Sequence, residues 1–282
     1  MIERLKNGVI GWLNREAVSK GFRLHDFEAI CSHLQMADVV LVEGRTRVSG
    51  VVQAVTLSNW SHAALYVGRV DELPHQRLRE RLRGEGGWSD EAQIVLEAEL
   101  GRGAILSDLR KYRDHHVRIC RPQDLLAVDA RRLVRHALEQ LGTPYDVRQI
   151  FDLLRFFFPY GLLPRRWRST LFGYRSGRHA RTVCSTLIAR SFARVRFPIL
   201  PVIQRDTSGR FYFVRRNSRL VVPRDFDNSP YFEIIKYPFL GGYDVDLYRQ
   251  MHWDNEGVAL DERNYRALAS GKRERAGGAG HD

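Results

Sequence analysis

Cysteine is scarce in this chain of 282 residues, with three cysteines at positions 31, 120 and 184. An odd and scattered set forms neither a disulfide framework nor the paired spacing of a zinc site. The sequence also has no apolar run long enough to span a bilayer and no glycine-rich phosphate-binding loop. We therefore expect a protein without disulfide bonds, without a bound metal and without any other cofactor.

A secretory signal is another feature that the sequence lacks. Residues 1–14 contain no long uncharged apolar core followed by a small-residue cleavage site. The low cysteine content also fits a reducing compartment. The sequence therefore predicts a cytoplasmic protein, and its basic character leaves peripheral association with the inner membrane open.

Negative charge is in the minority. Lysine and arginine number 45 against 33 aspartates and glutamates, for a formal net charge of +12. Such a surface could meet nucleic acid or anionic lipid headgroups, or it could serve solubility alone. Because no recognition motif accompanies the basic residues, we expect no nucleic-acid partner. An anionic membrane surface remains a candidate partner, and nothing in the sequence indicates the oligomeric state.

The chain divides into three predicted parts. Residues 1–35 predict a helical extension, because apolar residues recur there at helical spacing. Residues 36–240 predict one central domain, and residues 241–282 a C-terminal extension. The extension becomes charged and glycine-rich from about residue 270 and is expected to be disordered there.

The central domain mixes short β runs with helices, which is typical of the α+β class. Residues 69–92 are rich in Arg, Glu and Gly and predict an exposed connection. Residues 211–237 predict short strands or turns anchored by Phe211, Tyr212, Phe213, Phe226, Tyr231 and Phe232. The predicted strands cover residues 37–43, 60–68, 93–100, 104–106 and 117–122, and the predicted helices cover residues 46–57 and 129–141.

An aromatic block adjoins a basic cluster within residues 151–168. Three consecutive phenylalanines, Phe156–Phe158, are followed by the arginine-rich stretch Arg165–Arg168. Core packing is the default interpretation, because aromatic side chains dominate protein interiors. An acyl-chain groove or a membrane-facing surface would have the same composition, so both remain open.

Cys184 lies where a helix is predicted to begin, with Thr182 as a plausible cap. Leu187, Ile188 and Ser191 follow at helical spacing on the same face as the cysteine. A thiol in the first turn of a helix sits among free backbone N–H groups and the positive end of the helix dipole, and both favour the thiolate. The stretch predicts a nucleophile, although a small apolar residue packing a helix would show the same pattern.

His62 and Glu97 are the polar residues that could complete such a site. A thiolate nucleophile needs a base to share its proton, and the base needs an orienting partner. His62 opens an apolar β run and shares a face with Tyr66, and Glu97 lies inside the next run, 93–100. Either residue alone is more often structural. If the two strands pair, the Glu97 carboxylate could reach the His62 imidazole and fix its tautomer.

Five segments together resemble a known family. Their motifs appear in the order found in the circularly permuted NlpC-type papain-like hydrolases, the YiiX/YebB-like group, and are most similar to its bacterial lipo-like branch. In that group the histidine strand precedes the cysteine helix. The resemblance covers roughly residues 36–235, and its motifs are Asp38–Val42, Ser61–Gly68, Val95–Ala98, Leu141–Asp146 and Val183–Ile188.

The resemblance implies a circularly permuted papain-like fold, in which an antiparallel sheet packs against the cysteine-bearing helix. It implies a thiol hydrolase or acyltransferase with Cys184 as nucleophile, His62 as base and Glu97 as the orienting acid. One departure is Thr186, which stands where relatives often carry an acidic residue. Auxiliary or substrate-binding roles are candidates for Ser61, Tyr66, Tyr145 and Ser185.

The expected reaction is cleavage of an amide or ester acyl bond in a lipid-linked or cell-wall-type peptide substrate. The backbone N–H of Cys184 would help to hold the oxyanion, and His62 would protonate the leaving group. The alternative is a non-catalytic protein on the same scaffold that binds lipid or a membrane surface. That alternative would use the aromatic and basic residues of 151–168 and would not need Cys184.

Overall fold

The protein is described here from a computed structural model, which covers residues 27–73, 76–84, 86–144, 184–214 and 216–235. Helix α2 (Phe27–His33) belongs to one compact unit, and the described residues from 34 to 235 belong to another. The helical character predicted within 1–35 is present at Phe27–His33, in the described part of that range. No helix within the described ranges is long and apolar enough to cross a membrane. The boundaries 1–35, 36–240 and 241–282 stay a prediction.

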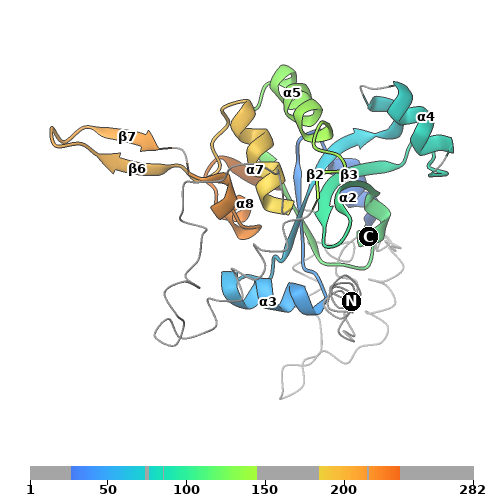
Figure 1. Ribbon diagram of the computed structural model, residues 1–282, viewed down its shortest axis with the longest axis horizontal. Coiled ribbons are helices and arrows are strands. Elements are labelled where there is room, and N and C mark those ends of the chain that lie inside the picture. The colour runs from blue at the N-terminus through green and yellow to red at the C-terminus, as the bar shows by residue number, and fades with distance from the viewer. Residues whose placement is uncertain (1–26, 74–75, 85, 145–183, 215, 236–282) are drawn as a thin grey trace, which may run out of the picture. The chain divides into compact units, whose positions relative to one another are not determined.

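The larger unit is built on a six-stranded sheet in which every neighbouring pair is antiparallel (Figure 1). The order across the sheet is β4-β3-β2-β1-β5-β8. This sheet confirms the predicted α+β class. Its strands are β1 (Val39–Val42), β2 (His62–Arg69), β3 (Gln93–Glu99), β4 (Gly103–Asp108), β5 (Val117–Pro122) and β8 (Phe232–Ile235).

Helix α7 (Cys184–Arg194) packs against β2 and β3, and α5 (Ala127–Leu138) packs against α7 (Figure 1). The arrangement follows from two apolar periods in the sequence, one of two residues in the strands and one of about 3.6 residues in the helices. Alternate strand residues such as Leu41, Leu65 and Leu96 are fully buried in the same core cluster as the helical residues Leu133 and Ile188. The prediction that the cysteine-bearing helix covers an antiparallel sheet is therefore confirmed.

Phe192 holds the C-terminal half of α7 to the sheet. Its fully buried ring lies 5.2 Å from that of Phe232 on β8 and 5.4 Å from that of Phe197, measured between centroids. Phe226, on α8 (Arg224–Asp227), completes the cluster at 6.4 Å. The segment from Phe226 to Phe232 is thus folded back onto the helix that carries Cys184.

The start of β2 is fixed by a contact with α8. The Trp60 indole donates a hydrogen bond to the Asp227 carboxylate at 3.1 Å. Arg118 pairs with the same carboxylate at 2.7 Å and lies over the Trp60 ring, 4.9 Å from its centroid. This cluster immediately precedes Ser61 and His62, so it fixes where the first residues of the strand lie.

The described part of the Leu141–Asp146 motif closes the outer edge of the sheet. Gly142 donates to the carbonyl of Ala104, and Ala104 donates to the carbonyl of Thr143, each at 2.9 Å. A Cβ on Gly103 would lie 2.3 Å from that Thr143 oxygen, so only glycine fits there. The turn covers the edge strand β4, and β4 in turn pairs with the strand that carries Glu97.

Two further helices also match the sequence pattern. Helix α3 (Arg47–Thr56) lies within the range predicted over 46–57 and is capped by the Thr46 side chain, which accepts from Ser49 N–H. Helix α5 ends at Leu138, and the following turn carries the chain to Gly142, whose φ is 78°. The predicted end of this helix at residue 141 was therefore too late by about one turn.

The prediction of an exposed connection over 69–92 holds for most of its described residues, and α4 (Gln76–Gly84) has none that is buried. The connection also contains η1 (Val70–Glu72), and Val70 and Leu73 are fully buried. The interpretation of the aromatic residues as anchors is wrong for three of them. Phe211, Tyr212 and Phe213 do not anchor the chain in the core, since they are 73%, 46% and 69% exposed. They lie on a hairpin of β6 (Val202–Arg205) and β7 (Phe211–Val214) whose residues are largely solvent-exposed. The block 151–168 lies outside the described residues.

Replacing Phe192 with alanine is expected to destabilise the protein by about 3–5 kcal/mol, because the ring is fully buried among three others. The matched control is Phe213→Ala on the hairpin, where we expect a change within about 0.5 kcal/mol. Denaturant unfolding of both variants measures the difference. Equal effects would contradict the assignment of one ring to the core and the other to solvent.

Candidate active site

His62 and Glu97 meet across the β2–β3 pair. Leu65 lies opposite Leu96 in this pair, and continuing that register places Glu97 opposite Ala64. His62, two residues before Ala64, is therefore a diagonal neighbour of Glu97 on the same face of the sheet. The His62 Nε2 atom lies 2.6 Å from the Glu97 carboxylate. The predicted strand pairing is present, and it brings the two side chains into a charge-assisted hydrogen bond.

The Glu97 carboxylate has no exposure to solvent and three hydrogen-bonding partners. The Tyr112 hydroxyl donates to the same oxygen as His62, and the Lys111 ammonium donates to the other oxygen at 2.5 Å. Burial alone would raise the pKa of Glu97. The hydrogen bond and charge of His62, together with Lys111, outweigh burial and hold that pKa well below its usual range. Glu97 is therefore an anion at neutral pH.

Cys184 is the first residue of α7 and is 4% exposed. Burial disfavours its thiolate, but the His62 charge and a hydrogen bond with the His62 side chain outweigh burial and lower the Cys184 pKa. The backbone N–H groups of Ala63 and Ser185 also donate to the sulfur. The second of these belongs to the first turn of α7, where N–H groups have no partner within the helix.

His62 is the link between the other two groups. Burial would lower its pKa, but the charges of Cys184 and Glu97 and a hydrogen bond with each raise it to about 10. Because Nε2 faces Glu97, Nδ1 is the ring nitrogen left for the Cys184 sulfur. The resting arrangement is a thiolate beside an imidazolium that a buried carboxylate orients.

The auxiliary candidates lie in different places. The Ser61 hydroxyl accepts from Gly44 N–H at 2.9 Å and so ties down the loop after β1. Tyr66 lies four residues along β2 from His62, roughly 13 Å away, and its hydroxyl donates to the Gln93 side chain. Ser185 donates through its hydroxyl to the carbonyl of Val221 at 2.7 Å, and only its backbone N–H faces the sulfur. Tyr145, like the predicted cap Thr182, lies outside the described residues.

Sequence reasoning missed Lys111 and Tyr112. Both lie on η2 (Leu109–Tyr112), a short turn of helix after β4, and neither stands in a recognisable motif. Lys111 also donates to Glu99 and, at 3.3 Å, to Ser107, so it neutralises two carboxylates of β3. The Tyr112 ring lies 6.0 Å from the His62 ring and covers the imidazole on one side. The signal in the sequence was Glu97 itself, because an acid inside an apolar strand needs a positively charged partner from elsewhere in the chain.

Within the ranges that the structure covers, no group of three or more His, Cys, Asp or Glu side chains could hold a metal ion. The side chains around Glu97 supply one carboxylate, one imidazole, one ammonium and one phenol. This set suits proton transfer and charge stabilisation at the sulfur of Cys184.

Iodoacetamide is expected to alkylate Cys184 faster near neutral pH, and with a weaker dependence on pH, than an ordinary thiol, because the His62 charge and hydrogen bond outweigh burial and lower the Cys184 pKa. In His62→Ala the rate should rise with pH, since the largest favourable charge is gone and burial then raises the thiol pKa. Site-resolved mass spectrometry measures the rates, with buried Cys120, whose pKa burial raises, as the internal reference. A wild-type rate that rises with pH as steeply as in the variant would contradict the ion pair.

The sequence was compared with known families and structures. Residues 33–153 match the family of permuted papain-like amidase enzymes that includes YaeF and YiiX. The match contains His62 and Glu97 and ends before Cys184. No curated protein matches the sequence. Among solved structures, a crystal structure of the metalloprotein YiiX from Escherichia coli O157:H7 is 15% identical, with a TM-score of 0.43. The alignment covers 72% of this chain and 96% of that one.

The predicted resemblance agrees with this result. The family match spans β1 to α5, and the antiparallel sheet that those elements form is covered by the helix that begins at Cys184. The membership of the narrower lipo-like branch stays a prediction. Over residues 33–153 the chain is therefore similar to the permuted papain-like amidases of the YaeF/YiiX type, and the described elements agree with that type of fold.

Proposed function

We propose that the protein is a cysteine amidase in which Cys184 attacks the carbonyl carbon of an acyl bond, with His62 as general acid and base and Glu97 as its orienting partner. The observation that carries this proposal is the chain of contacts from the Cys184 sulfur through the His62 imidazole to the buried Glu97 carboxylate. The three residues come from three elements, α7, β2 and β3. The family of permuted papain-like amidases supports the choice of a hydrolase.

The first half of the reaction forms an acyl-enzyme. The thiolate of Cys184 bonds to the carbonyl carbon, and the carbonyl π electrons move onto the oxygen. The backbone N–H of Cys184, at the start of α7, would stabilise that oxyanion and contribute about 3 kcal/mol. The C–N or C–O bond then breaks, and the leaving group takes the proton from His62. The products of this half are a thioester and a neutral imidazole.

The second half depends on a change in the pKa of His62. In the resting enzyme the Cys184 charge is the strongest influence that raises this pKa. A thioester carries no charge, so acylation removes that influence and the His62 pKa falls. The neutral imidazole can then accept a proton from water, which attacks the thioester and releases the acid. Glu97, which stays ionised and buried, holds the ring in the same tautomer throughout.

The substrate class follows from the same chemistry. A thiolate held beside an imidazolium can attack the carbonyl carbon of an amide or of an ester. We infer an amide as the preferred bond, in a lipid-linked or cell-wall-type peptide, because the family is one of amidases. An acceptor other than water in the second half would make the same site an acyltransferase.

Cys184→Ala is expected to lower kcat/KM by at least about a thousandfold on short acyl p-nitroanilides and p-nitrophenyl esters, because the Cys184 sulfur is the nucleophile that hydrogen-bonds to His62. Glu97→Gln should lower kcat by between about a hundredfold and ten-thousandfold, because an amide cannot stabilise the imidazolium. Intact-mass spectrometry should find the acyl group on Cys184 in the wild-type enzyme.

The matched control is Glu99→Gln. Glu99 lies on the same strand and binds the same Lys111, but its carboxylate makes no contact with His62 among the described interactions. We expect its activity to stay within about threefold of wild type. If Cys184→Ala keeps full activity and no acyl-enzyme forms on either substrate, the protein is not a thiol hydrolase. Vesicle binding that survives this loss would then favour the non-catalytic alternative.

A further inference from the structure

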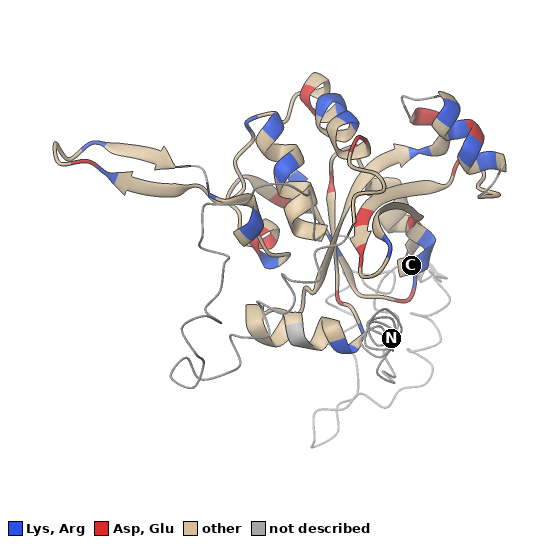
Figure 2. Ribbon diagram, viewed as in Figure 1, with Lys and Arg blue, Asp and Glu red and all other residues tan. Residues whose placement is uncertain are grey.

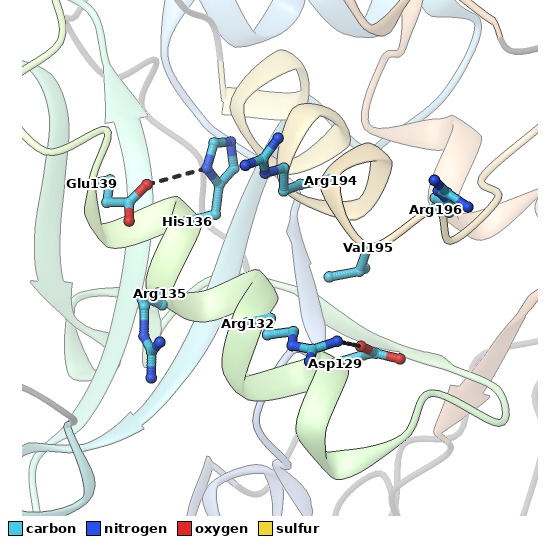
Figure 3. Close-up of a pocket in the computed structure, with 8 residues that line it drawn as sticks. All are labelled: Asp129, Arg132, Arg135, His136, Glu139, Arg194, Val195 and Arg196. Carbon is cyan, nitrogen blue, oxygen red and sulfur yellow. Dashed lines mark hydrogen bonds and ion pairs between the residues drawn. The ribbon is translucent and has the colours of Figure 1, made fainter.

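A basic groove lies between α5 and the C-terminal half of α7. Figure 2 shows Lys and Arg along both helices, and Figure 3 shows the groove from close by, with Arg194 and His136 extending toward each other from the two helices. Its volume is about 410 Å³. The lining residues are Asp129, Arg132, Arg135, His136, Glu139, Arg194, Val195 and Arg196.

The acidic residues of this groove are already paired. Asp129 binds Arg132 at 3.2 Å, and Glu139 binds His136 at 3.3 Å (Figure 3). Among the described residues no carboxylate pairs with the exposed guanidinium groups of Arg194 or Arg196. Two fixed positive charges that lack internal anions suit an anionic ligand from outside the chain.

An apolar pocket continues from the groove. Its volume is about 230 Å³, and Arg196 lines both cavities. Apolar side chains make most of its wall, including Phe197, Ile199 and Val221. Phe213 and Val214 of β7 form the side of the pocket next to the hairpin. Positive charge and exposed hydrocarbon therefore adjoin each other at the C-terminal end of α7.

The β6–β7 hairpin carries the densest group of exposed apolar side chains among the described residues. In the register of the two strands Ile203 lies opposite Phe213 and Arg205 opposite Phe211, so these four side chains share one face. Ile203, Phe211 and Phe213 are 61%, 73% and 69% exposed. The Arg205 guanidinium lies over the Phe211 ring, 5.5 Å from its centroid. In Figure 1 the hairpin extends away from the sheet and from α7.

Local contacts hold the hairpin in its shape. Asp206 accepts hydrogen bonds from the N–H groups of Ser208 and Arg210, and Gly209 supplies the positive φ of 88° that the turn needs. A two-stranded hairpin with exposed apolar residues is marginal in water without a surface to cover it. Large aromatic groups flanked by arginine are typical of segments that lie at a membrane interface.

Arg196 stands in an unfavourable backbone conformation. It lies just beyond α7 with a φ of 59°, and Phe197 N–H donates to the Phe192 carbonyl across it at 3.0 Å. Glycine is the residue that normally occupies this position, because the left-handed region strains a residue with a Cβ. The chain therefore keeps a guanidinium where stability alone would favour glycine, at the point shared by the groove and the pocket.

We propose that the basic groove, the apolar pocket and the β6–β7 hairpin together form a docking surface for an anionic phospholipid bilayer. Arg194 and Arg196 bind lipid phosphate groups, and Phe211, Phe213 and Ile203 enter the interface. The occupant follows from charge complementarity: the chain has a net charge of +12, and Arg196 lines the apolar pocket together with Phe213 of the hairpin. The proposal does not require that Cys184 be catalytic.

The test is co-sedimentation of the full chain with two kinds of vesicle, one of phosphatidylcholine and one that also contains about one fifth phosphatidylglycerol. Wild-type protein and Cys184→Ala should bind the anionic vesicles equally and bind the neutral ones weakly. The double variant Arg194→Gln, Arg196→Gln should bind the anionic vesicles roughly 30-fold more weakly. Phe211→Ser with Phe213→Ser should lower binding roughly tenfold, with an unchanged melting temperature because both rings are exposed.

Two matched controls separate this surface from general effects. Arg77→Gln with Arg81→Gln removes the same charge from exposed positions on α4, and Leu57→Ser with Leu126→Ser removes exposed apolar groups elsewhere. Both controls should bind as wild type does. Arg196→Gly is the sharpest variant, because it should raise the melting temperature and yet weaken vesicle binding roughly fivefold.

Several outcomes would overturn the proposal. Equal binding to neutral and anionic vesicles would remove the role of the arginines, and loss of binding in the α4 control would leave only a non-specific charge effect. A duplex oligonucleotide that binds through Arg194 and Arg196, without vesicle binding, would make the groove a nucleic-acid site. A concentration-dependent dimer that Phe211→Ser with Phe213→Ser abolishes, again without vesicle binding, would make the hairpin an interface between two copies.

Discussion

The candidate active site depends on one carboxylate, that of Glu97, which has no exposure to solvent. Moving a charge such as that of Glu97 out of water is costly, and a protein can keep it ionised only by surrounding it with donors and positive charge. Here β2 supplies His62, and η2 supplies Lys111 and Tyr112. All three must be in place together, so the position of the imidazole is coupled to the folding of the sheet. The sheet in turn presents that imidazole to the first turn of α7, which carries Cys184.

The same arrangement makes the proton state of the site depend on the state of the sulfur. His62 lies between two anions, Glu97 and Cys184, and only one of them changes charge during the proposed reaction. Glu97 orients the ring permanently, whereas Cys184 holds the proton on it only while the thiolate is free. A histidine paired with a carboxylate alone would have nearly the same acidity before and after the attack. The reacting sulfur thus sets the acidity of its own general acid.

The sequence allowed prediction of those parts of the site that lie on regular elements with a clear period. The alternation around His62 and Glu97 indicated two strands, and a shared face follows directly once the strands pair. Lys111 and Tyr112 were not predictable, because their approach to Glu97 depends on the β3–β4 register and on a single turn of 3-10 helix. Phe211 and Phe213 were placed wrongly for another reason. Aromatic residues alternate in the same way on a strand whether a core or solvent covers them, so composition alone could not show that this hairpin leaves the domain.

The two ends of α7 divide the proposed roles. Its N-terminus, with N–H groups that have no partner within the helix and the positive end of the dipole, favours a thiolate at Cys184. Its C-terminus carries the opposite partial charge, which accounts for a basic residue such as Arg194 in the last turn. That account does not extend to Arg196, which lies beyond the helix in a backbone conformation that glycine would adopt at lower cost. A strained backbone conformation persists where the surrounding structure holds it in place, and such residues are often found at functional sites. Among the described residues no carboxylate pairs with the Arg196 side chain. We infer that this side chain contacts a ligand instead. Its place between the basic groove and the apolar pocket points to a phosphate attached to hydrocarbon.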